Sequence, residues 1–140
     1  MLHAKWQQYR KLYGTSPERV DLLNDSAAFF FGIIDTVMWH DILLHITRLT
    51  DPPRTAGKAN LTLTRLPDGI TDQELSSAVA TLVHDAVAKS DFARDWRNRR
   101  IGHSDLALAL QDPRATPLKN TSRQSIENAL AALRRVMNKI

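Results

Sequence analysis

The sequence contains no cysteine among its 140 residues. Without cysteine the chain can form neither a disulfide nor a thiolate metal site, and it has no thiol nucleophile. Glycine-rich phosphate loops, paired-histidine zinc motifs and serine-nucleophile elbows are absent as well. These absences exclude the enzyme classes that such motifs mark, and we expect the protein to use no metal and no cofactor.

Long apolar runs are also scarce. The most apolar stretch, AAFFFGII at residues 27–34, is followed at once by Asp35 and a little later by His40 and Asp41. This run is far shorter than the roughly 20 apolar residues of a membrane span, and the first residues lack the apolar core of a secretion signal. We therefore expect no membrane partner and a cytoplasmic location.

The composition is that of a globular protein, with 43% hydrophobic and 24% charged residues. A single domain over residues 1–140 is long enough to bury its own core. The formal net charge of +4 favours an anionic partner without identifying one.

Apolar residues recur at helical spacing near the start of the chain. Leu2, Trp6, Tyr9 and Tyr13 form one stripe, which is typical of a core-facing helix and less typical of a base-stacking surface. Residues 17–50 then predict one helix about 50 Å long, because no strong stop signal precedes Asp51. The sequence NDS at residues 24–26 is the expected position of a break in it.

Two more helices are predicted in the second half of the chain, over residues 71–101 and 121–140. Irregular loops are expected near residues 51–60 and 104–121, where prolines cluster. No segment alternates with a period of two over a useful length. The predicted architecture is therefore all-α, a bundle of about four to five helices with one long central helix.

Three capping boxes indicate where helices begin, since a Ser or Thr hydroxyl and an acidic or amide side chain three residues later satisfy free backbone N–H groups. They are Thr15 with Glu18, Thr71 with Glu74, and Thr121 with Gln124.

The predicted long helix carries more apolar residues than one buried face can hold. Phe29, Phe30 and Phe31 alone spread around much of its circumference. The helix is therefore either central to a bundle or part of a subunit interface. The residues expected to be largely buried are Phe30, Ile34, Met38, Leu82, Trp96, Leu130 and Leu133.

Asp41 and His45 lie four residues apart on this helix, a spacing that two metal ligands can have. Spacing suggests no further ligand for them. Ordinary structural polar groups are the better interpretation.

The stretch RDWRNRRIGHSD, residues 94–105, combines four arginines with one histidine. On an ideal helix Arg99 and Arg100 share the face of His103, whereas Arg97 lies about 120° away. The stretch can be a solvated basic helix end, a phosphate-binding patch, or a small catalytic site in which His103 transfers protons. The residues alone leave these three alternatives open.

Arg97, the polar Asn98 and His103 resemble the arginine–polar–spacer–histidine motif of HEPN domains (higher eukaryotes and prokaryotes nucleotide-binding). Three blocks occur in the order found in the abortive-infection U type of that family. They are RLTDPP (48–53), KANLTLTRL (58–66) and WRNRRIGHSDL (96–106). The resemblance covers roughly residues 16–135.

The resemblance implies a helical bundle, commonly a homodimer, and often a metal-independent endoribonuclease of a toxin–antitoxin or antiphage system. Arg97, Asn98 and His103 would then be the catalytic residues. The resemblance does not make Arg99 or Arg100 members of the motif, but as neighbouring cations they are, with Arg94, candidate RNA phosphate ligands. RNA is the candidate substrate, and an antitoxin protein is a possible partner. The alternative is a non-catalytic module that binds RNA, a nucleotide or another protein.

Overall fold

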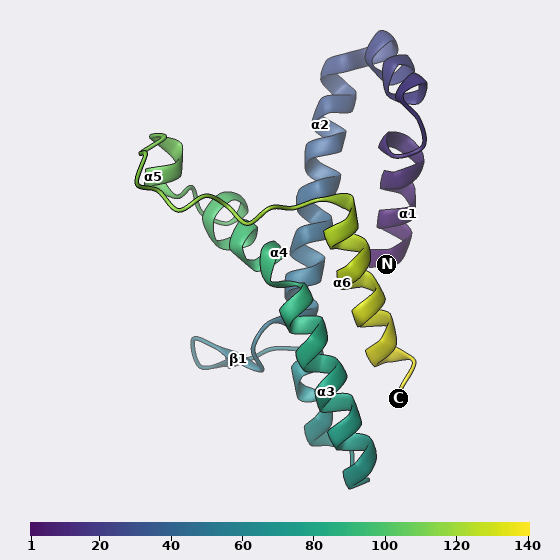
Figure 1. The fold of residues 1–140 in the computed structure, drawn as a ribbon, viewed down its shortest axis with the longest axis vertical. Coiled ribbons are helices and arrows are strands. Elements are labelled where there is room, and N and C mark those ends of the chain that lie inside the picture. The colour runs from purple at the N-terminus through teal and green to yellow at the C-terminus, as the bar shows by residue number, and fades with distance from the viewer. The chain divides into compact units, whose positions relative to one another are not determined.

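The computed structural model describes the whole chain, residues 1–140, and is all-α apart from one small hairpin (Figure 1). The chain forms two compact units, Met1–His45 and Ile46–Ile140, called here the N-terminal unit and the C-terminal unit. Their boundary lies inside the long helix α2. The predicted all-α fold class with one long helix is confirmed.

In chain order the elements are α1 (Leu2–Tyr13), α2 (Pro17–Thr50), β1 (Arg54–Thr55), β2 (Lys58–Ala59), η1 (Leu63–Arg65), η2 (Pro67–Gly69), α3 (Gln73–Lys89), α4 (Asp91–Trp96), η3 (Arg97–Ile101), α5 (Leu106–Ala109) and α6 (Arg123–Met137).

Aromatic rings build the core of the N-terminal unit. Trp6 and Tyr9 of α1 are buried and stacked, with their ring centroids 5.4 Å apart. Trp39 of α2 packs on both rings, at 6.4 Å from Trp6 and 5.3 Å from Tyr9. The aromatic stripe predicted over α1 therefore faces a core.

The predicted polar pair Asp41 and His45 contacts a lysine of α1. Lys5 Nζ donates a 2.6 Å hydrogen bond to Asp41 Oδ2 and lies 3.5 Å from His45 Nδ1. The cation beside this carboxylate is therefore an ammonium group that ties α1 to α2.

Helix α2 is broken at Ala27, whose backbone is extended (φ −166°, ψ 71°). The sequence placed the break at residues 24–26, one position earlier. Ser26 Oγ donates a 2.7 Å hydrogen bond back to the carbonyl oxygen of Leu22, the kind of competing bond expected of these side chains.

Beyond the break, α2 leaves an apolar face exposed in the N-terminal unit. Phe29 is 84% exposed, Phe30 56% and Val37 56%. The prediction that Phe30 is buried is therefore wrong for the single chain. Phe29, Ile33 and Val37 line a groove of about 640 Å³.

Over its whole length α2 is also long and apolar enough to cross a membrane, which the run at residues 27–34 alone did not indicate. Only 11% of its most apolar 18-residue window is buried. A single helix of this length and composition is by itself weak evidence of a membrane span.

The C-terminal unit has a conventional helical core in which α3 packs along α6 (Figure 1). The buried face of α3 presents Val79, Val83 and Ala86. Leu130 and Leu133 of α6 are only 1% and 3% exposed, which confirms their predicted burial. Four other residues predicted to be buried are only half-buried, namely Ile34, Met38, Leu82 and Trp96.

Each helix cap lies one residue after the predicted one. Ser16 accepts from the backbone N–H of Arg19, Asp72 from that of Leu75, and Ser122 from that of Ser125. Each observed cap directly follows a threonine, which is also an N-cap residue, so both positions fit the local pattern.

The helix predicted over residues 71–101 is interrupted at Ser90. Ser90 is fully buried, and its hydroxyl donates a 2.7 Å hydrogen bond to the carbonyl oxygen of Ala86. The chain resumes as α4 and then η3. Within the expected loop at 104–121, the short helix α5 begins after Asp105, whose carboxylate accepts from the backbone N–H of Leu108.

Candidate functional site

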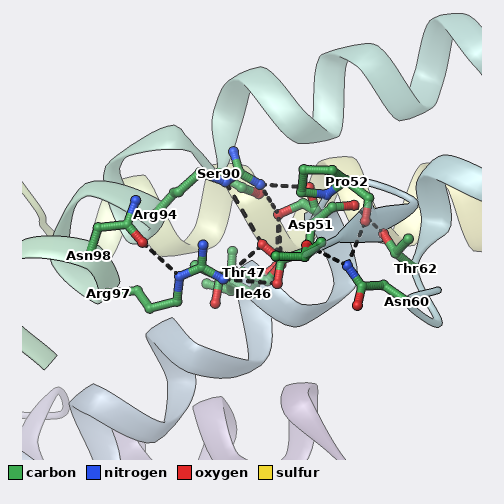
Figure 2. Close-up of polar contacts among 12 residues, drawn as sticks. Ile46, Thr47, Asp51, Pro52, Asn60, Thr62, Ser90, Arg94, Arg97 and Asn98 are labelled. Carbon is green, nitrogen blue, oxygen red and sulfur yellow. Dashed lines mark hydrogen bonds and ion pairs between the residues drawn. The ribbon is translucent and has the colours of Figure 1, made fainter. Parts of the chain in front are cut away.

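Three stretches far apart in the sequence meet at Asp51, directly after the end of α2 (Figure 2). Its carboxylate accepts hydrogen bonds from Arg97, and its backbone carbonyl oxygen lies 2.8 Å from the hydroxyl of Thr62 and 3.0 Å from that of Thr64. Asp51, Thr62 and Arg97 belong to RLTDPP, KANLTLTRL and WRNRRIGHSDL respectively. The three blocks that carry the family resemblance are therefore in contact within the C-terminal unit.

Arg97 is held on two sides of its guanidinium group. Nη1 donates to both carboxylate oxygens of Asp51 at 2.9 Å, and Nε donates to Asn98 Oδ1 at 3.0 Å. Nη2 has no hydrogen-bond partner in the protein, and the side chain is 31% exposed. The orientation of Arg97 is therefore fixed, while two N–H groups remain open to an anion.

Arg94 binds the C-terminal end of α2. Its Nη2 donates a 2.6 Å hydrogen bond to the carbonyl oxygen of Thr50, where a cation also complements the helix dipole. Its Nε lies 3.9 Å from Asp51 Oδ1. Two guanidinium groups thus lie beside one carboxylate, so the cluster of Arg94, Arg97 and Asp51 has a net positive charge. Binding of phosphate by Arg94 stays a prediction.

Residues Arg97–Ile101 form a single wide π-helical turn, η3. The N–H of Gly102 closes it by donating a 2.8 Å hydrogen bond to the carbonyl oxygen of Arg97. A Cβ atom at Gly102 would lie 3.0 Å from that oxygen, so glycine fits where a side chain would crowd. The ideal α-helical geometry behind the predicted pairing of His103 with the two arginines before it therefore does not apply.

Arg99 points into the protein and fastens the following loop. Its Nε donates to Asp105 Oδ2 at 3.0 Å, and its Nη2 donates to the carbonyl oxygen of Thr116 at 2.6 Å. The Arg99 hydrogen bond, followed by the backbone N–H of Leu108, holds the pKa of Asp105 below its ordinary value. A phosphate ligand would have to displace these partners, and phosphate binding by Arg99 stays a prediction.

His103 and Arg100 are exposed, and neither side chain makes a hydrogen bond or ion pair in the protein. Arg100 and Ser104 line a hollow of about 360 Å³, together with Arg99 and Asp105. No hydrogen bond or ion pair joins the His103 side chain to Arg97 or Asn98. The structure thus brings Arg97, Asn98 and Arg94 around Asp51, and it leaves His103 and Arg100 directed at solvent.

Asp51 and Thr62 are the residues that sequence reasoning missed at this site. Both lie inside the blocks that carry the family resemblance, yet neither was assigned a role. A usable signal was present, because Asp51 is the only acidic residue among four basic ones in residues 48–65. An isolated acid in a basic segment indicates a specific ion pair.

The chemistry available at the site is that of a guanidinium, an amide and an imidazole. No group of three or more His, Asp or Glu side chains in residues 1–140 is placed to hold a metal ion. The three groups of Arg97, Asn98 and His103 suit phosphate binding and proton transfer.

The chain matches one known protein family. The family model HEPN_AbiU2, described as AbiU2, matches residues 1–140 and so spans both units and all three blocks that meet at Asp51. No curated protein and no solved structure matches the chain significantly. The resemblance inferred from the sequence is thereby confirmed, and the chain belongs to the AbiU2 family of HEPN domains.

Proposed function

We propose that the protein is a metal-independent endoribonuclease of the toxin–antitoxin or abortive-infection type. Membership of the HEPN family supports a ribonuclease-like role in abortive infection. The observation that carries the proposal is the guanidinium of Arg97, fixed by Asp51 and Asn98 with Nη2 left open. Cytoplasmic RNA would be the substrate, and an antitoxin protein the regulatory partner.

The reaction begins when a 2′-hydroxyl of RNA attacks the adjacent phosphorus. A base takes the hydroxyl proton, the bond to the 5′-oxygen breaks, and an acid protonates that oxygen. The products are a 2′,3′-cyclic phosphate and a 5′-hydroxyl. Arg97 would bind the phosphate oxygens, Asn98 would hold Arg97 in place, and His103 would carry protons.

One chain supplies a single histidine at the site, whereas this mechanism uses both a base and an acid. A two-fold homodimer would supply a second His103 and a second Arg97. The exposed apolar face of α2 supports self-association, because Phe29, Phe30 and Val37 are more than half exposed in the single chain.

The alternative function is a non-catalytic HEPN module that binds RNA, a nucleotide or another protein. One observation favours it: His103 makes no hydrogen bond to a carboxylate that would orient its ring. Binding of phosphate by arginine alone would not need this histidine.

The test is RNA cleavage in the presence of a chelator, with product ends identified by mass spectrometry. We expect cyclic phosphate ends and no cleavage where the 2′-hydroxyl is replaced by hydrogen. His103→Ala should lower the rate on the order of 100-fold or more. Arg97→Lys should also be harmful, because an ammonium group lacks the planar fork.

Arg114→Ala is a suitable control, since that side chain is 90% exposed and bonds only to Asp112. Cleavage by His103→Ala at the parent's rate, or no cleavage by the parent protein on any RNA tried, would favour the binding module instead.

A further inference from the structure

The only strands in the molecule form a hairpin, β1 with β2, that stands clear of the helices of the C-terminal unit (Figure 1). All four strand residues are exposed. The turn is Ala56–Gly57, and both residues have positive φ, 48° and 79°. Two-stranded hairpins are marginal by themselves, and this one buries no apolar strand residue to support it.

Polar bonds hold the hairpin in shape instead. The side-chain amide of Asn60 donates to the carbonyl oxygen of Pro52 and to the hydroxyl of Thr55, each at 2.8 Å. The backbone N–H of Asn60 donates to the carbonyl oxygen of Pro53 at 2.9 Å, and Arg54 Nη2 donates to that of Gly57 at 3.2 Å. An ordered segment that adds nothing to the core is well suited to binding.

Both ends of the hairpin are anchored at the residue that holds Arg97 (Figure 2). Arg54 follows Asp51 by three residues, so their Cα atoms lie at most about 11 Å apart. On the other side, the hydroxyl of Thr62 bonds the backbone of Asp51. The hairpin therefore has a fixed origin next to the guanidinium that would bind the reacting phosphate.

The segment around the hairpin carries an excess of positive charge. Residues 48–65 contain four Lys or Arg and one Asp, a net charge of +3, whereas the whole chain has +4. That single acid, Asp51, is already bound by Arg97. Lys58 has no partner in the protein, and Arg54 uses one donor within the hairpin.

The strand register separates the two hairpin cations. Arg54 pairs with Ala59, and Thr55 pairs with Lys58. Directly paired residues share a face and neighbours along a strand alternate, so Arg54 and Lys58 lie on opposite faces. They cannot enclose one small anion together, but they can contact two different phosphates of a polyanion.

We propose that the β1–β2 hairpin is an RNA-binding arm whose Arg54 and Lys58 contact backbone phosphates beside the one held at Arg97. The inference rests on the proposed function, because Arg97 supplies the reference point on the RNA. Contacts of this kind are independent of base sequence and depend strongly on salt.

The test measures binding of a short fluorescein-labelled single-stranded RNA by anisotropy over a series of salt concentrations. All proteins carry His103→Ala, which prevents cleavage. Replacing Arg54 or Lys58 by Gln should each lower the slope of log K against log salt by about 0.7, and replacing both by about 1.4. At near-physiological salt the double variant should bind about 10-fold more weakly.

The matched control replaces Arg114 and Lys139 by Gln, which removes the same charge at two other exposed positions. It should change the slope much less. The proposal of an RNA-binding arm would be wrong if the hairpin variant and its parent had equal salt slopes and affinities. It would also be wrong if the control lost as much RNA affinity as the hairpin variant.

The same measurements separate this inference from the proposed function. Suppose that the His103→Ala parent binds RNA but the protein with His103 intact cuts none. Weaker binding by the hairpin variant would then still support the RNA-binding arm, whereas the proposed nuclease activity would be wrong. If the parent binds no RNA at any salt concentration, both fail.

Discussion

The two units differ in what they leave exposed to a partner. The N-terminal unit has four Lys or Arg against five Asp or Glu, a net charge of −1, and exposes a contiguous apolar face on α2. The C-terminal unit has fifteen Lys or Arg against ten Asp or Glu, a net charge of +5.

This difference indicates two kinds of partner for one chain. A large exposed apolar face is unfavourable in water and is typical of a surface that binds another protein or a membrane. An excess of cations with unused N–H groups is stable in water and marks a surface for anions. We therefore propose that the first unit self-associates and that the second binds RNA.

The largest expected contrast concerns packing. Leu130→Ala should lower the free energy of unfolding by about 2–5 kcal/mol, because the side chain is 1% exposed and its loss leaves a cavity. Phe29→Ala should change it little, since that ring is 84% exposed in the single chain. Urea denaturation at low protein concentration, where dimers dissociate, measures both. Equal losses would show that Phe29 belongs to a core.

The second contrast concerns association. Ile33→Asp should raise the dimer dissociation constant on the order of 100-fold, because each copy would bury an unpaired charge. Sedimentation equilibrium measures this. Leu106→Asp is the matched control in the C-terminal unit, where Leu106 is 71% exposed. If the parent protein stays monomeric at high concentration, the apolar face is not a dimer surface.

The third contrast compares one ion pair from each unit. Asp51→Asn should lower the free energy of unfolding by about 1.5–3 kcal/mol, since its carboxylate is 16% exposed and accepts two charged hydrogen bonds. Asp41→Asn should cost at most about 1 kcal/mol, because Asp41 is 38% exposed. RNA cleavage should fall only for Asp51→Asn, where Arg97 loses its anchor. An equal effect of the two changes would mean that Asp51 is an ordinary surface acid.

The smallest effect concerns acid stability of the C-terminal unit. Arg99 and the backbone N–H of Leu108 lower the pKa of Asp105, so this carboxylate contributes stability above the pKa it has in the unfolded chain, about 4. That contribution is lost as the pH falls further, through the lowered pKa of the folded protein. Asp105→Asn should therefore flatten the fall in melting temperature between pH 5 and pH 3. A parallel fall in parent and variant would contradict it.

Much of the fold could be predicted because helices follow from local spacing. The bounds of α2 were predicted from its start and stop signals, and the break near residues 24–26 from side chains that compete for backbone hydrogen bonds. The structure agrees with both to within one residue. The caps were each missed by one position, since Thr–Ser and Thr–Asp neighbours offer two adjacent side chains that can both accept a hydrogen bond. The interruption at Ser90 was missed because a single buried serine resembles any helical polar residue.

The candidate site could be predicted only in part. Arg97, Asn98 and His103 follow from one short motif, and the structure joins the first two directly. Asp51 lies 46 residues before Arg97, and nothing in the local pattern pairs them. The orientation of the Arg99 side chain could not be predicted either. Its partners Asp105 and Thr116 lie in a loop whose course depends on tertiary packing.

The sequence by itself determined the all-α class, the long second helix and the family, because each depends on residues close together or on ordered blocks. Only the tertiary structure decided that those blocks meet at Asp51, that Arg97 keeps one end of its fork open, and that Phe30 faces solvent. The reason is physical: hydrogen bonds and burial depend on positions in space, and folding brings together groups that the chain separates by tens of residues.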